Sequence, residues 1–212
     1  GGADAADFAC SISGSTVNIA FAADPNYESP ADADTDNEYI VTVLIDDGVA
    51  DDANGATTLT ITVADVNDIT PTYTATSTTP TVTEGSTAVD SNVAITDADT
   101  GDSNTCNLGG ADAGSFTCTL TGQTAYTLAF SSAPDYENPG STASSNEYTV
   151  TVSINDGSND GTTITYTVTV ADANDQTPVY QAADADDAIT VNENVGTGSI
   201  DAGTITDTDT VG

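Results

Sequence analysis

The stretch NEYTVTVSINDG, residues 146–157, decides the fold class of this chain. Its apolar side chains, Tyr148, Val150, Val152 and Ile154, alternate with Thr or Ser. A period of two is that of a strand with one apolar face and one polar face, and Thr is the polar residue that best suits a pleated surface. The closing Asn-Asp-Gly is a turn signal. The stretch therefore predicts a half-buried antiparallel strand that ends in a turn.

The same alternation occurs on both sides of this stretch. In SFTCTLTG, residues 115–122, Phe, Cys and Leu alternate with Thr, and in ITYTVTV, residues 164–170, Ile, Tyr and Val do so. The turn-rich segment NDGSNDG, residues 155–161, separates two of these runs, and no segment has a convincing helical period. About a hundred residues of short alternating strands predict an all-β fold, a Greek-key β-sandwich of immunoglobulin-like architecture.

The stretch has an earlier copy, NEYIVTVLIDDG, at residues 37–48, which is 146 − 37 = 109 residues before it. Two more segments repeat in the same order: GGADAADFACSISG at 1–14 answers GGADAGSFTCTLTG at 109–122, and ADVNDITP at 64–71 answers ADANDQTP at 171–178. Self-similarity at a fixed period indicates repeated domains. The domains expected are the C-terminal part of one repeat at 1–70, a complete repeat at 71–177 and the N-terminal part of a further repeat at 178–212.

The charge of the chain is one-sided. It contains 34 acidic residues and no Lys, Arg or His, which gives a net charge of −34; six of the acids are Glu, so 34 − 6 = 28 are Asp. Two carboxylates about 4 Å apart in water repel by roughly 1 kcal/mol, so a compact form needs cations from solvent or from a partner. An acidic surface adapted to high salt is the alternative interpretation.

This composition excludes several classes of function. Phosphates are bound largely by Lys and Arg, so neither nucleic acid nor an anionic membrane is an expected partner. No apolar run approaches the roughly 18 residues of a membrane helix, so membrane insertion is not expected. Without His or Lys, a catalytic acid or base near neutral pH would have to be a carboxylate. A glycosidase-like carboxylate pair is the alternative, but ion binding explains the acids better, and we do not expect an enzyme.

The three cysteines leave alternatives open. Cys118 alternates with inward apolar residues, and Cys106, which we expect in the preceding loop, is close enough in sequence for a bridge; free thiols are the alternative. A bridge would indicate an oxidising, extracellular setting. Cys10 occupies the position equivalent to Cys118, and we expect a buried free thiol packed between Phe8 and Ile12.

Several acidic motifs occur in a fixed order along the chain. Each linker carries Asp-x-Asn-Asp closely followed by Pro, at 65–71 and 172–178; PDYENP lies at 134–139, and ITDADTG at 95–101. In this order the motifs resemble those of tandem cadherin-like repeats. The resemblance covers the full length and implies calcium sites that collect carboxylates from two successive sandwiches and stiffen the linker. It also implies an extracellular or cell-surface location. A solvated turn is the alternative for any one motif.

The resemblance assigns metal ligands residue by residue. For the first junction it assigns Glu28, Asp65, Asn67, Asp68, Asp97, Asp99 and Asp156. For the second junction it assigns Glu84, Asp135, Glu137, Asp172, Asn174 through its backbone carbonyl, Asp175, Asp207 and Asp209. Asp47 would face a further junction upstream. The linkers depart from the family pattern at their fifth position, Ile69 and Gln176, and Asn26 replaces the equivalent of Asp135.

Two other acidic runs are similar to the calcium loop of helix-loop-helix proteins. They are DADTDNEYIVT, starting at residue 32, and DADTGDSNT, starting at residue 97. Both lack the Gly at the sixth position and the Glu at the twelfth. We therefore reject a helix-loop-helix calcium site for both.

These observations predict a structural protein of calcium-rigidified tandem repeats that forms an extended extracellular fibre or cell-surface filament. The alternative is a cell-surface adhesin module that binds a partner protein or glycan, but the Tyr and Phe positions fall on inward faces. The chain begins and stops midway through a repeat, so we expect head-to-tail self-association or a longer repetitive polypeptide, with Gly212 of one copy near Gly1 of the next.

Overall fold

Residues 1–46, 55–181, 193 and 203–209 are the part of the chain that the structure, a computed structural model, describes. The chain divides into two compact units. Unit 1 comprises Gly1–Thr70, Asp97–Ser103 and Asp156–Asn159. Unit 2 comprises Pro71–Thr96, Asn104–Asn155 and Asp160–Gly212.

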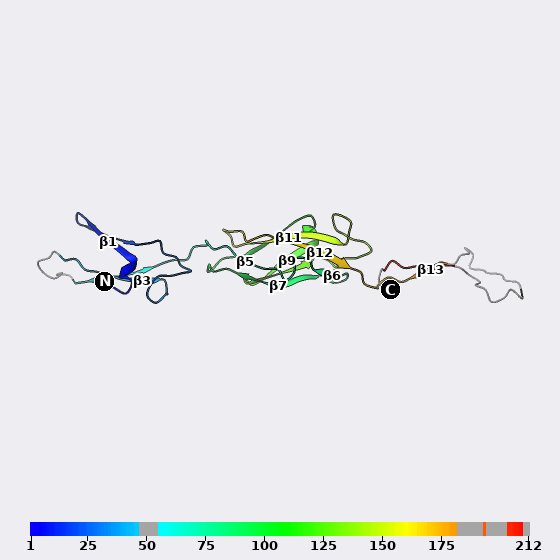
Figure 1. Ribbon diagram of the computed structural model, residues 1–212, viewed down its shortest axis with the longest axis horizontal. Coiled ribbons are helices and arrows are strands. Elements are labelled where there is room, and N and C mark those ends of the chain that lie inside the picture. Colours follow the sequence, from blue (N-terminus) through cyan, green and yellow to red (C-terminus); the bar gives the residue numbers. More distant parts are fainter. Residues whose placement is uncertain (47–54, 182–192, 194–202, 210–212) are drawn as a thin grey trace. The chain divides into compact units, whose positions relative to one another are not determined.

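Unit 2 contains two four-stranded sheets, with the strand orders β5-β7-β10-β9 and β6-β12-β11-β8 (Figure 1). Their strands are β5 (Thr72–Tyr73), β6 (Thr81–Thr83), β7 (Ala88–Thr96), β8 (Thr105–Gly109), β9 (Phe116–Thr121), β10 (Ala125–Phe130), β11 (Glu147–Asn155) and β12 (Ile164–Ala171). A 3₁₀ turn, η2 (Ala113–Ser115), precedes β9. The two sheets share one apolar core and form a β-sandwich, so the predicted fold class is confirmed.

The core of unit 2 follows from the alternation in the sequence. On β11 the exposed fraction is 3% for Tyr148 and 0% for Val150. These side chains face the same way as their partners on β12, because the antiparallel register pairs Val150 with Tyr166 and Tyr148 with Val168. The intervening Thr side chains lie on the outer face. The predicted half-buried strands are therefore present at these positions.

One strand pair is parallel, whereas the sequence patterns predicted antiparallel strands. Strand β6 pairs with β12 in parallel, with Val82 opposite Val170. Strand β5 instead pairs antiparallel with β7 in the other sheet. The segment from β5 to β6 therefore crosses from one sheet to the other, and Pro80 stands just before β6. The alternation along β6 shows which of its side chains share a face, but it does not reveal whether the partner strand runs parallel or antiparallel.

A buried polar chain joins the two sheets of unit 2. The hydroxyl groups of Tyr126 on β10 and Tyr166 on β12 lie 2.8 Å apart, and the Tyr166 hydroxyl donates to Asp90 Oδ2 on β7 at 2.9 Å. Asp90 Oδ2 also accepts from the backbone N–H of Thr76. Burial, and then the hydroxyl of Tyr126, raise the pKa of Tyr166 well above its ordinary value. Asp90 is thus a structural acid, used to satisfy a buried hydroxyl.

A disulfide joins Cys106 and Cys118 and so connects β8 in one sheet with β9 in the other. The bridge is the first of the two alternatives that the spacing left open. The expected location of Cys106 in a loop is wrong, because it lies within β8 and pairs with Ile154 of β11. Closing a loop of this size stabilises a fold by about 3 kcal/mol in the chain-entropy account.

Unit 1 contains two strand pairs (Figure 1). They are β1 (Phe8–Ser13) with β2 (Thr16–Phe21), and β3 (Glu38–Val43) with β4 (Thr57–Thr62); the 3₁₀ turn η1 (Ala5–Asp7) precedes β1. Phe8, Phe21 and Tyr39 pack together with ring centroids 4.6 to 6.0 Å apart. Their equivalents in unit 2, Phe116, Phe130 and Tyr148, are separated by 4.5 to 6.1 Å. The two repeats therefore build the same aromatic cluster.

The expected burial of Cys10 is wrong. Cys10 is an exposed free thiol, and its neighbour Ile12 is 66% exposed. In unit 2 the equivalent Cys118 is covered by β8, to which it is bridged. Among the described residues of unit 1, no strand occupies the place that β8 has in unit 2. Alternation predicted the strand correctly, but burial requires a covering strand as well.

A further antiparallel pair, β13 (Val179–Gln181) with β14 (Thr204–Thr206), follows the sandwich of unit 2. Its pairing of Val179 with Thr206 repeats that of Thr72 with Thr96 in β5 and β7. The pair β13–β14 therefore has the same local pairing as the pair β5–β7. No helix in the described part of the chain is long and apolar enough to cross a membrane.

Candidate metal centres

Acidic side chains of unit 1 gather where strands end. We call this group the first cluster; its members are Glu28, Asp65, Asp97, Asp99, Asp102 and Asp156. Asp65 follows β4, Asp97 directly follows β7, and Asp156 directly follows β11. One oxygen from each of Glu28, Asp65 and Asp99 lies within 4.8 Å of the others. The same holds for Asp97, Asp99 and Asp102, so Asp99 belongs to both triads.

Backbone hydrogen bonds fix the linker carboxylates of the first cluster. The N–H of Thr100 donates to Asp65 Oδ2 at 2.6 Å, and the Thr100 hydroxyl donates to the same oxygen. These two bonds lower the pKa of Asp65. The N–H of Ile69 donates to Asp99 Oδ2 at 2.8 Å. The linker and the turn after β7 therefore hold each other through one oxygen of each carboxylate.

Asn67 connects the linker to the turn after β11. Its Nδ2 donates to the backbone oxygen of Asp156 at 3.1 Å, and its Oδ1 accepts from Asn159 Nδ2 at 3.1 Å. Asp156 Oδ1 accepts from the N–H groups of Ser158 and Asn159. The side chain of Asn67 is therefore a bridge between two turns. Asp68 is exposed and belongs to neither triad. A backbone hydrogen bond lowers the pKa of Glu28, but burial, then Asp65 and then the charge of Asp68 outweigh it and raise that pKa.

The first cluster holds oxygen atoms that have neither solvent nor a hydrogen-bond donor. They are Glu28 Oε1, Asp65 Oδ1, Asp97 Oδ2, Asp99 Oδ1, Asp102 Oδ2 and Asp156 Oδ2. Burial, and then the charges of Asp99, Asp156 and Asp102, raise the pKa of Asp97. Buried ionised carboxylates are costly unless they are paired or coordinate a metal, and the chain has no cationic side chain to pair with them. These oxygens fit a hard cation.

Unit 2 has an equivalent group, which we call the second cluster. Its members are Glu84, Glu137, Asp172, Asp175 and Asp209. Oxygens of Glu84, Glu137 and Asp175 lie within 4.8 Å of one another, as do oxygens of Glu137, Asp172 and Asp209. Both oxygens of Glu137 are inaccessible and without a donor. Burial, and then the charges of Glu84, Asp172 and Asp209, raise its pKa.

Glu84 connects two segments of the second cluster by accepting backbone hydrogen bonds from both. Its Oε1 accepts from the N–H of Ala173 at 2.7 Å, and its Oε2 accepts from the N–H of Tyr136 at 2.7 Å. The carboxylate thus ties the linker to the segment that carries Glu137. Glu84 is only 8% exposed, so these two bonds replace the water that it loses.

The linker geometry of the first cluster recurs in the second. Gln176 donates its N–H to Asp209 Oδ2 at 2.8 Å, as Ile69 does to Asp99. The N–H of Asp209 donates to Asp207 Oδ1 at 3.2 Å, as the N–H of Asp99 does to Asp97 Oδ1. The same network thus forms twice with different residues at the fifth linker position, because that position contributes its backbone N–H.

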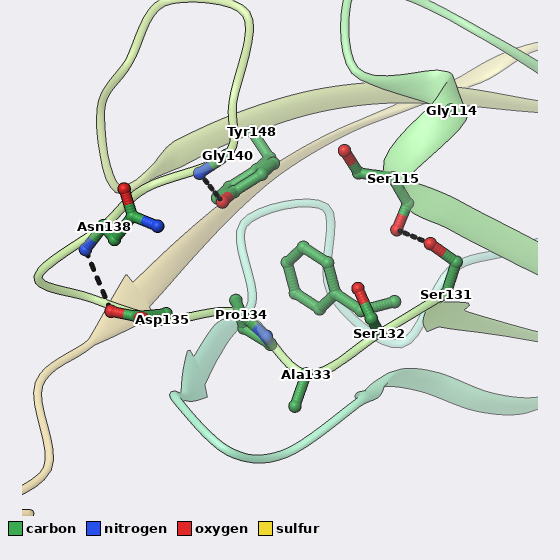
Figure 2. Close-up of a pocket in the computed structure, with 11 residues that line it drawn as sticks. Gly114, Ser115, Ser131, Ser132, Ala133, Pro134, Asp135, Asn138, Gly140 and Tyr148 are labelled. Carbon is green, nitrogen blue, oxygen red and sulfur yellow. Dashed lines mark hydrogen bonds between the residues drawn. The ribbon is translucent and has the colours of Figure 1, made fainter.

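Six of the predicted ligands that the structure describes belong to no triad: Asn67, Asp68, Asp135, Asp156, Asn174 and Asp207. Asp135 Oδ1 accepts from the N–H of Asn138 at 2.9 Å and so closes a turn beside a pocket (Figure 2). Asn26 Oδ1 does the same for Ser29 at 3.0 Å, which explains why Asn and Asp exchange at this position. Asp207 and Asn174 are exposed and belong to no described triad. Asp47 lies outside the described residues.

Asp102 belongs to the first cluster, although the acidic motifs of the sequence did not predict it. The family motif supplies only the Asp-x-Asp of residues 97–99, and Asp102 lies three residues later in the same turn. The sequence contained a signal for it, because the run DADTGD places three acids in one turn between strands, where a bound cation would offset their mutual repulsion.

Known proteins of similar structure identify the fold. No protein-family model and no curated protein sequence matches the chain. The cis-dimer structure of protocadherin gammaB7 EC3-6 has 24% identity and a TM-score of 0.63, and the match covers 99% of this chain and 47% of that one. The structure of human CDH23 EC21-23 has 25% sequence identity and a TM-score of 0.59, and the match covers 97% of this chain and 66% of that one. The structure of mouse cadherin-23 EC22-24 has 21% sequence identity and a TM-score of 0.52, and the match covers 79% of this chain and 50% of that one. This chain therefore spans about half to two thirds of each of these solved structures.

Proposed function

Because this chain has the cadherin-like repeat fold, we propose that it is part of an extracellular adhesion-type structural protein whose linkers bind calcium. One observation carries the proposal. Carboxylate oxygens that are inaccessible and lack a donor recur at equivalent places in the first and second clusters, in a chain without any cationic side chain. A cation from solvent is the remaining source of compensating charge.

The donor set of both clusters suits calcium. Calcium takes about six to eight oxygen ligands at roughly 2.3 to 2.6 Å in a flexible geometry. In the first cluster Asp99 belongs to both triads, so it could contribute to two ions. In the second cluster Glu137 likewise belongs to both triads. Bound calcium would supply the positive charge that lets these carboxylates lie close together.

The residues of the linker would determine how calcium acts on the chain. Ile69 and Gln176 already bind an acidic turn through their backbone N–H groups. With cations present, the remaining carboxylate oxygens would reinforce those contacts, so the linker would lose its freedom to bend. Without cations, the same carboxylates would repel each other. We infer that calcium converts tandem repeats into a stiff fibre or filament.

Self-association is the second part of the proposal. The solved structure of protocadherin gammaB7 EC3-6 is a cis-dimer, which favours association between copies as a role for such repeats. We propose head-to-tail association in a filament, with adhesion to another cell-surface molecule as the second candidate. The predicted approach of Gly212 to Gly1 involves a residue outside the described part of the chain. It stays a prediction.

Removing calcium is the test of the proposed function. We expect chelation to lower the melting temperature, because a ligand bound to the folded state stabilises it by mass action. Small-angle scattering should show a smaller maximum dimension and a broader distribution of shapes after chelation. Sodium chloride at matched ionic strength is the control for simple charge screening. An identical melting curve and scattering profile with calcium and with chelator would contradict the proposal.

A further inference from the structure

The loop before β3 in unit 1 carries three alternating acids that belong to neither cluster. They are Asp32, Asp34 and Asp36, and one oxygen of each lies within 4.8 Å of the others. We propose that this loop, residues 32–36, is an additional binding site for a hard divalent cation, with calcium as the expected ion. The site would be local to one repeat, unlike the two clusters at the linkers.

The buried state of Asp32 points to a ligand. Asp32 is 4% exposed, which is unusual for a carboxylate in a loop. Its Oδ2 accepts from the N–H of Asp36 at 2.8 Å. Its Oδ1 is inaccessible to solvent and has no hydrogen-bond donor. The free oxygen therefore belongs to the loop that also carries the carboxylates of Asp34 and Asp36, where a cation could satisfy all three.

A second buried acid, Asp4, anchors the 32–36 loop through backbone hydrogen bonds. Asp4 is 2% exposed, and its Oδ1 accepts from the N–H of Ala33 at 2.7 Å. Its Oδ2 accepts from the N–H of Ile40 at 2.6 Å. Both oxygens of Asp4 are thus used to anchor the loop to β3. A loop that is fixed in advance loses little conformational entropy when it binds an ion.

The complete repeat contains a natural control for this site. Positions 32, 34 and 36 correspond to Ser141, Ala143 and Ser145, because 141 − 32 = 109. There the hydroxyl of Ser141 donates to the backbone oxygen of Ser145 at 2.7 Å and accepts from its N–H at 2.9 Å. The serine loop therefore closes on itself without any charge.

The two loops share their backbone frame. Asp112 anchors the serine loop as Asp4 anchors the acidic one, by accepting from the N–H groups of Thr142 and Thr149. The backbone is left-handed at Thr35, with φ 59°, and at the equivalent Ser144, with φ 52°. The acidic side chains of the 32–36 loop are therefore unnecessary for the shape of the loop. Another role, ion binding, accounts for them.

The chemistry of the loop favours calcium over magnesium. Three carboxylates close together suit a cation that accepts many oxygen ligands in irregular geometry, whereas magnesium demands near-octahedral geometry and retains several waters. The site is still no helix-loop-helix site, since the strand β3 starts at Glu38, two residues after Asp36. Water would complete the coordination. Extracellular calcium-binding modules have dissociation constants of about 10⁻⁴ to 10⁻³ M, and we expect the same range for this loop.

The test exchanges the residues of the two loops in the full chain. The variant Asp32→Ser, Asp34→Ala, Asp36→Ser gives the loop the residues of the complete repeat, and we expect it to bind one calcium ion fewer in equilibrium dialysis. The reciprocal variant Ser141→Asp, Ala143→Asp, Ser145→Asp should bind one more. Unchanged calcium stoichiometry in the first variant, with native circular dichroism, would overturn the proposal.

Two further arms keep the test decisive. The single change Asp34→Ala covers the case in which the triple variant fails to fold, because it keeps the bonds from the N–H of Asp36 to Asp32 Oδ2 and from the N–H of Glu38 to Asp36 Oδ1. We expect it to weaken the site at least tenfold. Excess magnesium should leave the calcium count unchanged, and full displacement by magnesium would overturn the choice of calcium. Repeating the exchange in an Asp65→Asn, Asp99→Asn background separates this site from the linkers, because the loss of one ion should persist there.

Discussion

The hairpin β1–β2 of unit 1 and the hairpin β9–β10 of unit 2 have the same register and different burial. Phe8 pairs with Phe21 as Phe116 pairs with Phe130. Yet Ile19 on β2 is only half-buried, whereas its equivalent on β10, Leu128, is 0% exposed. Local sequence therefore fixes pairing and aromatic contacts, while burial depends on whether a second sheet covers the hairpin.

The largest expected effect comes from truncating equivalent positions of the two hairpins. Leu128→Ala should destabilise unit 2 by about 2 to 5 kcal/mol, because it opens a cavity in a closed core. The equivalent change in unit 1, Ile19→Ala, should cost much less, since Ile19 is only half-buried. Hydrogen exchange read separately for peptides of each unit measures both effects. Equal losses would show that β1–β2 is covered as well as β9–β10.

The disulfide is the next largest difference between the hairpins. The double change Cys106→Ser, Cys118→Ser should lower the free energy of unfolding of unit 2 by about 3 kcal/mol, because it reopens a loop in the unfolded chain. Cys10→Ser is the matched control at the equivalent strand position and should change nothing, since Cys10 is an exposed free thiol. Urea unfolding under oxidising conditions compares the two variants. A loss of stability in Cys10→Ser would mean that the thiol is packed.

The sequence predicted the local features of the fold and did not predict the contacts between distant segments. Alternation in NEYTVTVSI placed the strand β11 and its buried face correctly, because strand period and side-chain polarity are local properties. The parallel pairing of β6 and the tie from Glu84 to Tyr136 could not be predicted, because they depend on contacts between residues far apart in the chain. Asp90 is similar, since only the fold shows that this acid serves a buried tyrosine.

The order of the acidic motifs predicted which acids gather, and the structure shows which of them instead hold turns. Glu28, Asp65, Asp97 and Asp99 come together as expected from the family pattern. Asp135 and Asn67 instead use their side chains in turns, a distinction that no spacing rule contains. The assignment of individual calcium ligands at the two clusters stays a prediction.

The smallest expected effect is a stability profile with two opposing branches in pH. In the absence of calcium, the raised pKa of Glu137 means that the folded state holds its proton more tightly than the unfolded chain. Stability should therefore rise as the pH falls from neutral through that raised pKa. Calcium at saturating concentration should remove this branch, because it replaces the proton as the source of neutralisation.

The second branch arises from the acid that anchors the loop before β11. Burial raises the pKa of Asp112, but the N–H groups of Thr142 and Thr149 outweigh burial and hold it below its ordinary value of 3.8. Its contribution is therefore present above that ordinary value and is lost as the pH falls through the lowered pKa. Melting temperatures of unit 2 between pH 7 and pH 2 should pass through a maximum without calcium. The variant Asp112→Asn should lack the steep acid branch while keeping the rise due to Glu137, and a profile identical to that of the parent chain would contradict the anchoring role of Asp112.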